Sequence, residues 1–151
     1  MGVTPDEFYD ETRVAIVPMG FCFPGLDAKG GDKPPRRECA PQWHHSVFRA
    51  LPKLELMLLV GLYAQRWHLR GAMHGNLTET VAAWREIGAP SDRPKMIPLP
   101  HPSWRNTAWI KNHPWFEAEL LPQVRRDVWM ALQNQGRTRK WFPPLAERIR
   151  P

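Results

Sequence analysis

Cysteine, long apolar runs and glycine-rich phosphate loops are scarce or missing in this 151-residue chain. Two cysteines are too few for a disulfide framework, which favours a reducing compartment and a cytoplasmic location. No apolar run approaches the roughly 20 residues of a membrane-spanning helix, and the first residues lack the charged and apolar pattern of a leader. Neither an internal repeat nor a Rossmann or P-loop glycine motif is present. We therefore expect a soluble intracellular protein.

Positive charge and tryptophan are abundant instead. The chain carries 21 Lys and Arg against 15 Asp and Glu, a net charge of +6, which suits a polyanionic partner. Several of its eight tryptophans stand next to an Arg or a His, a combination used to bind single-stranded or flipped-out bases. For any one tryptophan, packing in the core is the alternative. The 42% hydrophobic content suffices for one domain, which we place at residues 1–135, followed by a basic, proline-rich tail at 136–151.

Strand-like and helix-like segments alternate along the chain. Apolar runs predict strands at residues 13–19, 54–60 and 96–99, the second of them a central parallel strand covered by helices. Capping signals and apolar spacing predict a short helix after Thr4 and further helices near residues 41–51, 62–69, 77–87, 106–111 and from 114 onward. Pro122 should kink or restart the last helix. This order predicts an α/β fold with a mainly parallel sheet.

The most informative segment is the His-Pro-Ser loop at residues 101–103, which follows an apolar run and leads into Trp104 and Arg105. An enzyme that extracts a base from DNA needs such a set: a donor for the base, a group for the phosphate and a wedge for the vacated stack. Prolines on both sides of His101 fix φ and stiffen the loop before any ligand arrives. The alternative is a proline-rich strand-to-helix connection that carries a surface histidine.

Three loops follow the predicted strands, namely those after residues 19, 60 and 99. The first of them belongs to an irregular segment at residues 20–42, whose length favours a function over a plain connection. Ligands of open parallel sheets bind beyond the carboxyl ends of the strands. We therefore expect the three loops to lie on one edge of the sheet and to form a site there.

Five sequence blocks resemble the uracil-DNA glycosylase superfamily, and most closely a bacterial branch related to its iron–sulfur families. The blocks stand in the family's order at residues 15–25, 31–40, 58–65, 98–103 and 112–116. The resemblance covers roughly residues 7–132. It implies a three-layer α/β/α sandwich around a four-stranded parallel sheet.

The resemblance also implies the activity, which is hydrolysis of the N-glycosidic bond of uracil or a related damaged base flipped out of DNA. His101 matches the histidine that donates a hydrogen bond to uracil O2 as negative charge develops on the departing base. Ser103 would hold a backbone phosphate, and Trp104 or Arg105 would enter the minor groove. Further expected contacts are a base pocket at Met19, Gly20 and Phe21 and DNA-binding side chains at Lys33, Arg36 and Arg37. We expect a monomer that acts on DNA at the nucleoid.

The sequence departs from the family pattern in ways that bear on activity. The family's first motif, a glycine-rich loop that positions the attacking water, is missing, so we expect the sheet to lack its first strand and helix. Cys22 and Cys39 match the second pair of iron–sulfur ligands, while the first pair is missing. A 4Fe–4S cluster is therefore expected only in a longer form of the protein. Pro18 stands where the related enzymes carry an asparagine that reads uracil, and Trp104 replaces a family proline.

Two other interpretations stay open. One is a catalytically silent DNA-binding remnant, which would bind through the basic loop at residues 33–37 and the tryptophan-rich edge with salt-sensitive affinity. The other is a truncated fragment without a function of its own. The identity of the excised base is open as well.

Overall fold

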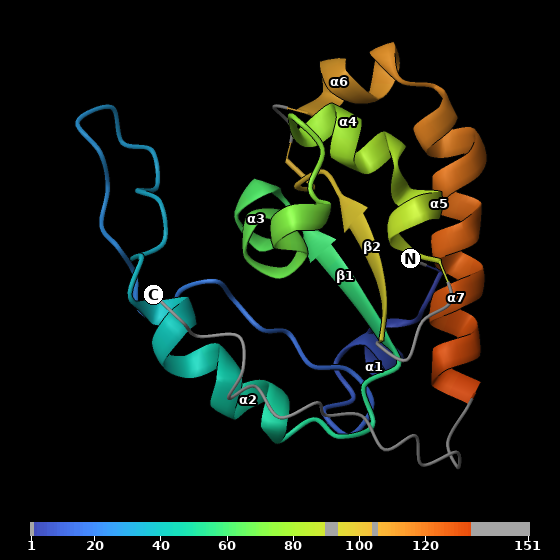
Figure 1. Ribbon diagram of the computed structural model, residues 1–151, viewed down its shortest axis with the longest axis horizontal. Coiled ribbons are helices and arrows are strands. Elements are labelled where there is room, and N and C mark those ends of the chain that lie inside the picture. The colour runs from blue at the N-terminus through green and yellow to red at the C-terminus, as the bar shows by residue number, and fades with distance from the viewer. Residues whose placement is uncertain (1, 90–93, 104–105, 134–151) are drawn as a thin grey trace. The chain divides into compact units, whose positions relative to one another are not determined.

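The computed structural model of the chain describes residues 2–89, 94–103 and 106–133 (Figure 1). These residues form two compact units. The larger unit takes its described residues from 2–15 and from 54 onward, and the smaller unit consists of residues 16–53. The predicted basic tail lies outside the described residues. Within the described ranges, no helix has the length and apolar content needed to cross a bilayer.

A parallel pair of strands forms the centre of the larger unit. Strand β1 (Leu56–Val60) pairs with β2 (Lys95–Leu99) in the register that sets Val60 opposite Leu99. The pairing ends with a hydrogen bond of 2.8 Å from the Gly61 N–H to the Leu99 carbonyl. The predicted parallel strands are therefore confirmed, and the sheet has two strands among the described residues.

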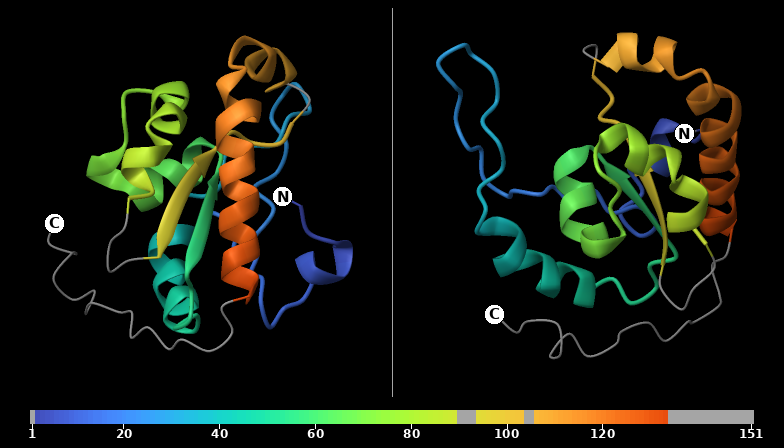
Figure 2. Two further views of the ribbon diagram at one scale, coloured as in Figure 1. Left: turned by 90° about the vertical axis from the view of Figure 1, so that its right-hand side faces the viewer. Right: turned by 45° about the horizontal axis from the view of Figure 1, so that its top comes forward.

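Helices cover both sides of this short sheet. Helix α3 (Leu62–Leu69) lies on one side of the strands, and α7 (Leu121–Gln133) lies on the other (Figures 1 and 2). Helices α4 (Leu77–Ala82) and α5 (Trp84–Ile87) both pack on β2. This helix–sheet–helix order confirms the predicted α/β fold.

The core lies on the β2 side of the sheet. Its fully buried centre consists of Val81, Ile97, Leu120 and Val124, and Trp84, Leu99 and Phe116 complete the cluster. The expectation of a β1 strand covered on both faces is wrong: its first three residues are half-buried, and Val60 is 40% exposed. β2 is the better buried strand, since its last three residues are buried.

Pro98 lies within β2 and Pro100 follows it directly, and neither proline weakens the pairing with β1. Lys95 and Leu99 make their backbone hydrogen bonds toward the β1 side. Since alternate residues of a strand direct their N–H groups to opposite sides, an N–H at position 98 or 100 would point away from β1. Pro98 and Pro100 therefore cost the ladder no donor, and they leave an edge that another strand cannot readily extend.

The predicted strand at residues 13–19 is wrong. The chain runs there as an irregular segment, visible in blue in Figure 1, after a turn in which the Arg13 N–H donates to the Asp10 carbonyl. Ile16 is 66% exposed, so the apolar pattern of the segment is not buried against a layer. Pro18 has no N–H to donate to a ladder. The described sheet therefore has two strands. The resemblance implied four, of which the first was already expected to be missing from this chain.

Most predicted helices are confirmed. Residues 41–51 form a π-helical turn at Ala40–His44 followed by α2 (His45–Arg49), and residues 106–111 form α6 (Thr107–Asn112). Helix 62–69 is confirmed as α3. The segment at 77–87 begins at the predicted cap, where the Glu79 N–H donates to the Asn76 side chain at 3.0 Å, and it divides into α4 and α5 at Ala83.

Pro122 restarts the last helix as predicted. Residues Phe116–Leu120 form a π-helical turn, closed by the Leu121 N–H, which donates to the Phe116 carbonyl. Regular α7 geometry begins at Leu121, next to the proline. Because Pro122 has no N–H, it cannot extend the hydrogen bonds of the preceding turn, and a wider turn accommodates it.

The smaller unit is organised around His44, which is 2% exposed. The His44 Nε2–H donates to the Pro18 carbonyl at 3.0 Å. The rings of Phe21 and Phe48 meet the imidazole edge-on at 5.9 and 5.7 Å. This contact set is that of a core histidine held by a hydrogen bond and by aromatic packing.

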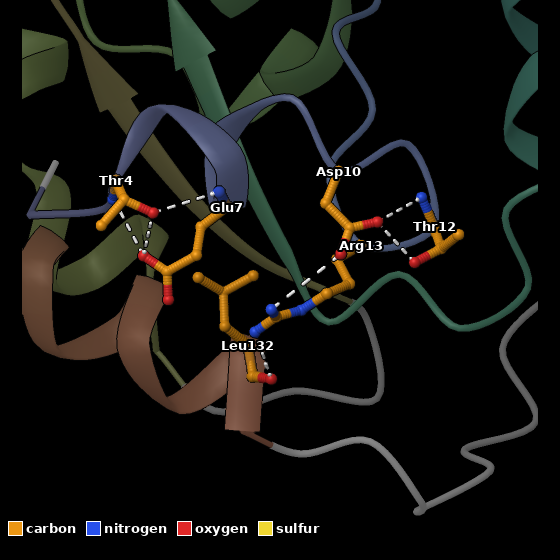
Figure 3. Close-up of polar contacts among 6 residues, drawn as sticks. All are labelled: Thr4, Glu7, Asp10, Thr12, Arg13 and Leu132. Carbon is orange, nitrogen blue, oxygen red and sulfur yellow. Dashed lines mark hydrogen bonds and ion pairs between the residues drawn. The ribbon is translucent and has the colours of Figure 1, made fainter.

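The first residues of the chain are held by short polar contacts (Figure 3). Helix α1 (Pro5–Phe8) has the predicted capping box, in which Thr4 and Glu7 each bond the other's backbone N–H at 3.2 and 2.9 Å. Asp10 accepts from the Thr12 hydroxyl and amide at 2.6 and 3.0 Å. These two donors hold the pKa of the Asp10 carboxylate below its usual value.

Arg13 then ties this segment to α7. Its Nη2 donates to the Leu132 carbonyl at 3.0 Å, and the side chain is 22% exposed (Figure 3). A cation that bonds a carbonyl in the last turn of a helix complements the helix dipole.

We expect Arg13→Ala to lower the free energy of unfolding by about 1–2 kcal/mol, because a charge-assisted bond to the end of α7 is lost. Urea denaturation followed by tryptophan fluorescence measures this change. Arg126→Ala is the matched control, since Arg126 is exposed and donates to Gln123 of its own helix at 2.7 Å. Its expected effect is within about 0.5 kcal/mol. Equal losses in the two variants would contradict the anchoring role of Arg13.

Candidate active site

Strand β2 delivers the chain into the His-Pro-Ser loop. Leu99 and Pro100 are buried, whereas His101 and Pro102 are exposed. Prolines at 100 and 102 fix φ at both positions and restrict the residue that precedes each of them. The imidazole of His101 therefore reaches solvent from a stiff connection at the carboxyl end of a buried strand.

Hydrogen bonds within the loop fix the backbone of His101. Its carbonyl accepts from the Ser103 N–H at 2.8 Å and from Asn106 Nδ2 at 2.5 Å. The Asn106 N–H in turn donates to the Ser103 carbonyl at 2.9 Å. Two donors on one carbonyl leave the peptide after His101 little freedom to rotate.

Asn106 is a functional contact that sequence reasoning missed. It precedes α6 as its N-cap, but its side chain makes no capping bond and bonds the His101 carbonyl instead. An asparagine before a helix predicts a cap. The signal that could have identified it is its position five residues after His101, in a loop already interpreted as functional.

Gly61 brings the end of β1 against His101. A Cβ placed on Gly61 would lie 3.5 Å from the His101 Cβ and 3.7 Å from its Cδ2. Gly61 has φ 83° and ψ 167°, a conformation that only glycine adopts readily. The loops after residues 60 and 99 therefore lie on one edge, as predicted from the parallel sheet.

Apolar side chains are exposed at this edge of the sheet. Val60, directly before Gly61, is 40% exposed, and Tyr63 in the first turn of α3 is 50% exposed. An exposed imidazole, a hydroxyl residue and apolar side chains are thus gathered at the ends of β1 and β2. This combination can hydrogen-bond and contact a planar polar ring.

The family assignment agrees with this geometry. Residues 1–125 match the family model described as the uracil DNA glycosylase superfamily. The chain belongs to the uracil DNA glycosylase superfamily. The match includes both strands and the His101 loop and ends within α7. The predicted membership is confirmed, and it assigns the chain to a superfamily of glycosylase-type DNA repair proteins that act on DNA.

Of the predicted site residues, the structure of this superfamily member brings His101 and Ser103 together on one loop; Ser103 is half-buried. Trp104 and Arg105 lie outside the described residues. The remaining residues belong to the smaller unit: Met19 and Gly20 are half-buried, and Phe21, Lys33, Arg36 and Arg37 are exposed. Whether these residues share a site with His101 stays a prediction.

The two cysteines do not fit an iron–sulfur cluster. Both thiols are free, with Cys22 exposed and Cys39 buried. A 4Fe–4S cluster normally takes four thiolate ligands, twice the number this chain has. In the described part of the chain, no three His, Cys, Asp or Glu side chains come together to bind a metal.

We expect Gly61→Ala to lower the free energy of unfolding by about 1–3 kcal/mol, because an alanine at this φ and ψ is strained. Gly71→Ala is the matched control, since Gly71 has no positive φ and an added Cβ there meets nothing within 4 Å. The control should be neutral or slightly stabilising. Urea denaturation of the two variants decides, and an unchanged stability of Gly61→Ala would contradict the strained turn beside His101.

Proposed function

We propose that this chain hydrolyses the N-glycosidic bond of uracil, or of a related damaged base, flipped out of DNA. The observation that carries the proposal is the exposed imidazole of His101 on a hydrogen-bonded loop at the carboxyl end of β2. Membership of the superfamily supports DNA as the substrate.

The reaction places negative charge where His101 can stabilise it. The bond between the base nitrogen and C1′ of the sugar breaks, and both electrons leave with the base. Water supplies a hydroxyl to C1′ and a proton to the base, so the products are an abasic site and the free base. His101 donates a hydrogen bond to O2 of the departing base, where the charge gathers. One such preorganised donor is worth about 3–4 kcal/mol, or roughly 100- to 1,000-fold in rate.

Other residues hold the DNA in this proposal. The Ser103 side chain contacts a backbone phosphate, while Met19, Gly20 and Phe21 line the base pocket. Extrusion of a base costs a few kcal/mol, which protein contacts to the base and to the strand offset. Trp104 and Arg105 are the candidates for the group that fills the vacated stack.

Exposed basic side chains of the smaller unit supply the charge-dependent contacts to DNA in this proposal. Lys33, Arg36 and Arg37 are all exposed, and Phe23 of the same unit is 70% exposed. Basic side chains with exposed aromatics bind nucleic acid without reading its sequence. This observation also favours the second candidate function, binding of DNA without excision of a base.

We expect His101→Ala to slow excision at least about 100-fold while leaving the affinity for DNA unchanged. The measurement is a single-turnover assay, with protein in excess over a uracil-containing oligonucleotide, in which abasic sites are cleaved by alkali and resolved on a gel. Long incubations allow slow excision to be detected.

His74→Ala is the matched control for this assay. His74 lies in the larger unit, its side chain is 44% exposed, and its Nε2 lies 3.8 Å from a carboxylate oxygen of Glu86. Its removal should leave the excision rate unchanged. Equal rates for wild type and His101→Ala would contradict the assigned role. Salt-sensitive binding of the oligonucleotide with no abasic site formed would establish the second candidate function in its place.

A further inference from the structure

Gln65 of α3 is a polar side chain with 0% exposure. Its Nε2 donates to the Leu99 carbonyl at 2.9 Å and approaches the Leu59 carbonyl at 3.4 Å. Its Oε1 has no hydrogen-bond partner among the described residues. A buried amide whose oxygen is unpaired costs stability, and an apolar side chain of the same size would avoid that cost. Stability alone therefore does not explain a glutamine at this position.

The carbonyl that Gln65 contacts is the last one of β2. The same Leu99 oxygen accepts from the Gly61 N–H at 2.8 Å, so both of its lone pairs are used. The Gln65 N–H donates to the Gly61 carbonyl at 3.2 Å, which fixes the start of α3 relative to this joint. Gln65 thus links the end of β1, the end of β2 and the first turns of α3.

This carbonyl controls the direction in which the His101 loop leaves the sheet. The peptide that joins Leu99 to Pro100 has no N–H, so a hydrogen bond can hold it only through its oxygen. The ring of Pro100 fixes φ at that residue, and a rotation of the peptide would therefore carry His101 with it. The bond from Gln65 supplements the one from Gly61 and resists that rotation.

We propose that Gln65 is a positioning residue for His101, acting through the Leu99 carbonyl on a side chain that it does not touch. The inference rests on the proposed glycosylase function of His101. Its expected consequence is a slower chemical step with unchanged DNA binding, because a displacement of a reacting group by about 1 Å can cost roughly 100-fold in rate.

The first test compares Gln65→Met with a buried polar residue elsewhere in the same unit. Methionine keeps the length of the side chain and removes both polar atoms. Thr80→Val is the matched control: Thr80 is also 0% exposed, and its hydroxyl donates to the His74 and Asn76 carbonyls at 2.9 and 2.8 Å. Gln65→Met should slow single-turnover excision about 10- to 100-fold. Thr80→Val should leave the rate unchanged at a temperature where both variants are folded.

A double-mutant cycle separates positioning from a general loss of structure. Because Gln65 acts through His101, Gln65→Met should slow excision no further when His101→Ala is already present. Gln65→Glu adds a dependence on pH: the protonated acid can donate to the Leu99 carbonyl, whereas the carboxylate cannot. Its rate relative to wild type should therefore rise as the pH falls.

Amide hydrogen exchange tests the positioning without any excision. The Gly61 and Ser103 N–H groups report the bond at the joint and the turn after His101. Gln65→Met should speed their exchange by about tenfold or more relative to the Leu59 and Ile97 amides inside the strands, and Thr80→Val should not. If the wild type excises nothing, the proposed function fails, and exchange still decides the role of Gln65. Unchanged exchange in Gln65→Met, or equal rate losses in Gln65→Met and Thr80→Val, would overturn the proposal.

Discussion

The bond from the Gly61 N–H to the Leu99 carbonyl, 2.8 Å long, joins the ends of the two parallel strands. The position of His101 depends on this hydrogen bond between the two strand ends. Parallel pairing sends β1 and β2 out of the sheet on the same edge, so the start of α3 and the His101 loop meet there. Glycine suits this turn because its φ is 83°, a backbone conformation that other residues rarely adopt. Pro100 and Pro102 restrict backbone rotation, so the end of the strand also fixes the path of the loop.

The α/β fold was predictable because its signals are local. Thr4 and Asn76 stand before their helices with the acidic partner three residues later, and both caps form as expected. The irregular segment at 13–19 was not predictable in the same way, because a strand also needs a neighbour and a covering layer. Its residues Val14, Ile16 and Val17 have the composition of a strand, yet Ile16 is 66% exposed.

The candidate site was predictable where one residue acts from one loop and unpredictable where residues meet through the fold. His101 and Ser103 were identified because they are adjacent in a proline-bounded motif. Asn106 and Gln65 were missed as site residues because each acts on a backbone carbonyl, and nothing in a sequence shows which carbonyl a side chain will reach. Whether residues of the smaller unit belong to the site depends on how the two units are placed, and no short motif encodes that placement.

The central claim is that His101 contacts the base that leaves the DNA. Its most direct measurement is the nitrogen NMR spectrum of the imidazoles in the complex with an oligonucleotide carrying 2′-fluoro-2′-deoxyuridine, whose electron-withdrawing fluorine slows departure of the base. The account predicts that one donated hydrogen bond shifts a ring nitrogen of His101, assigned from the His101→Ala spectrum, while His74 and the stacked His113 keep their resonances. A saturated complex in which the His101 nitrogens do not move would contradict it.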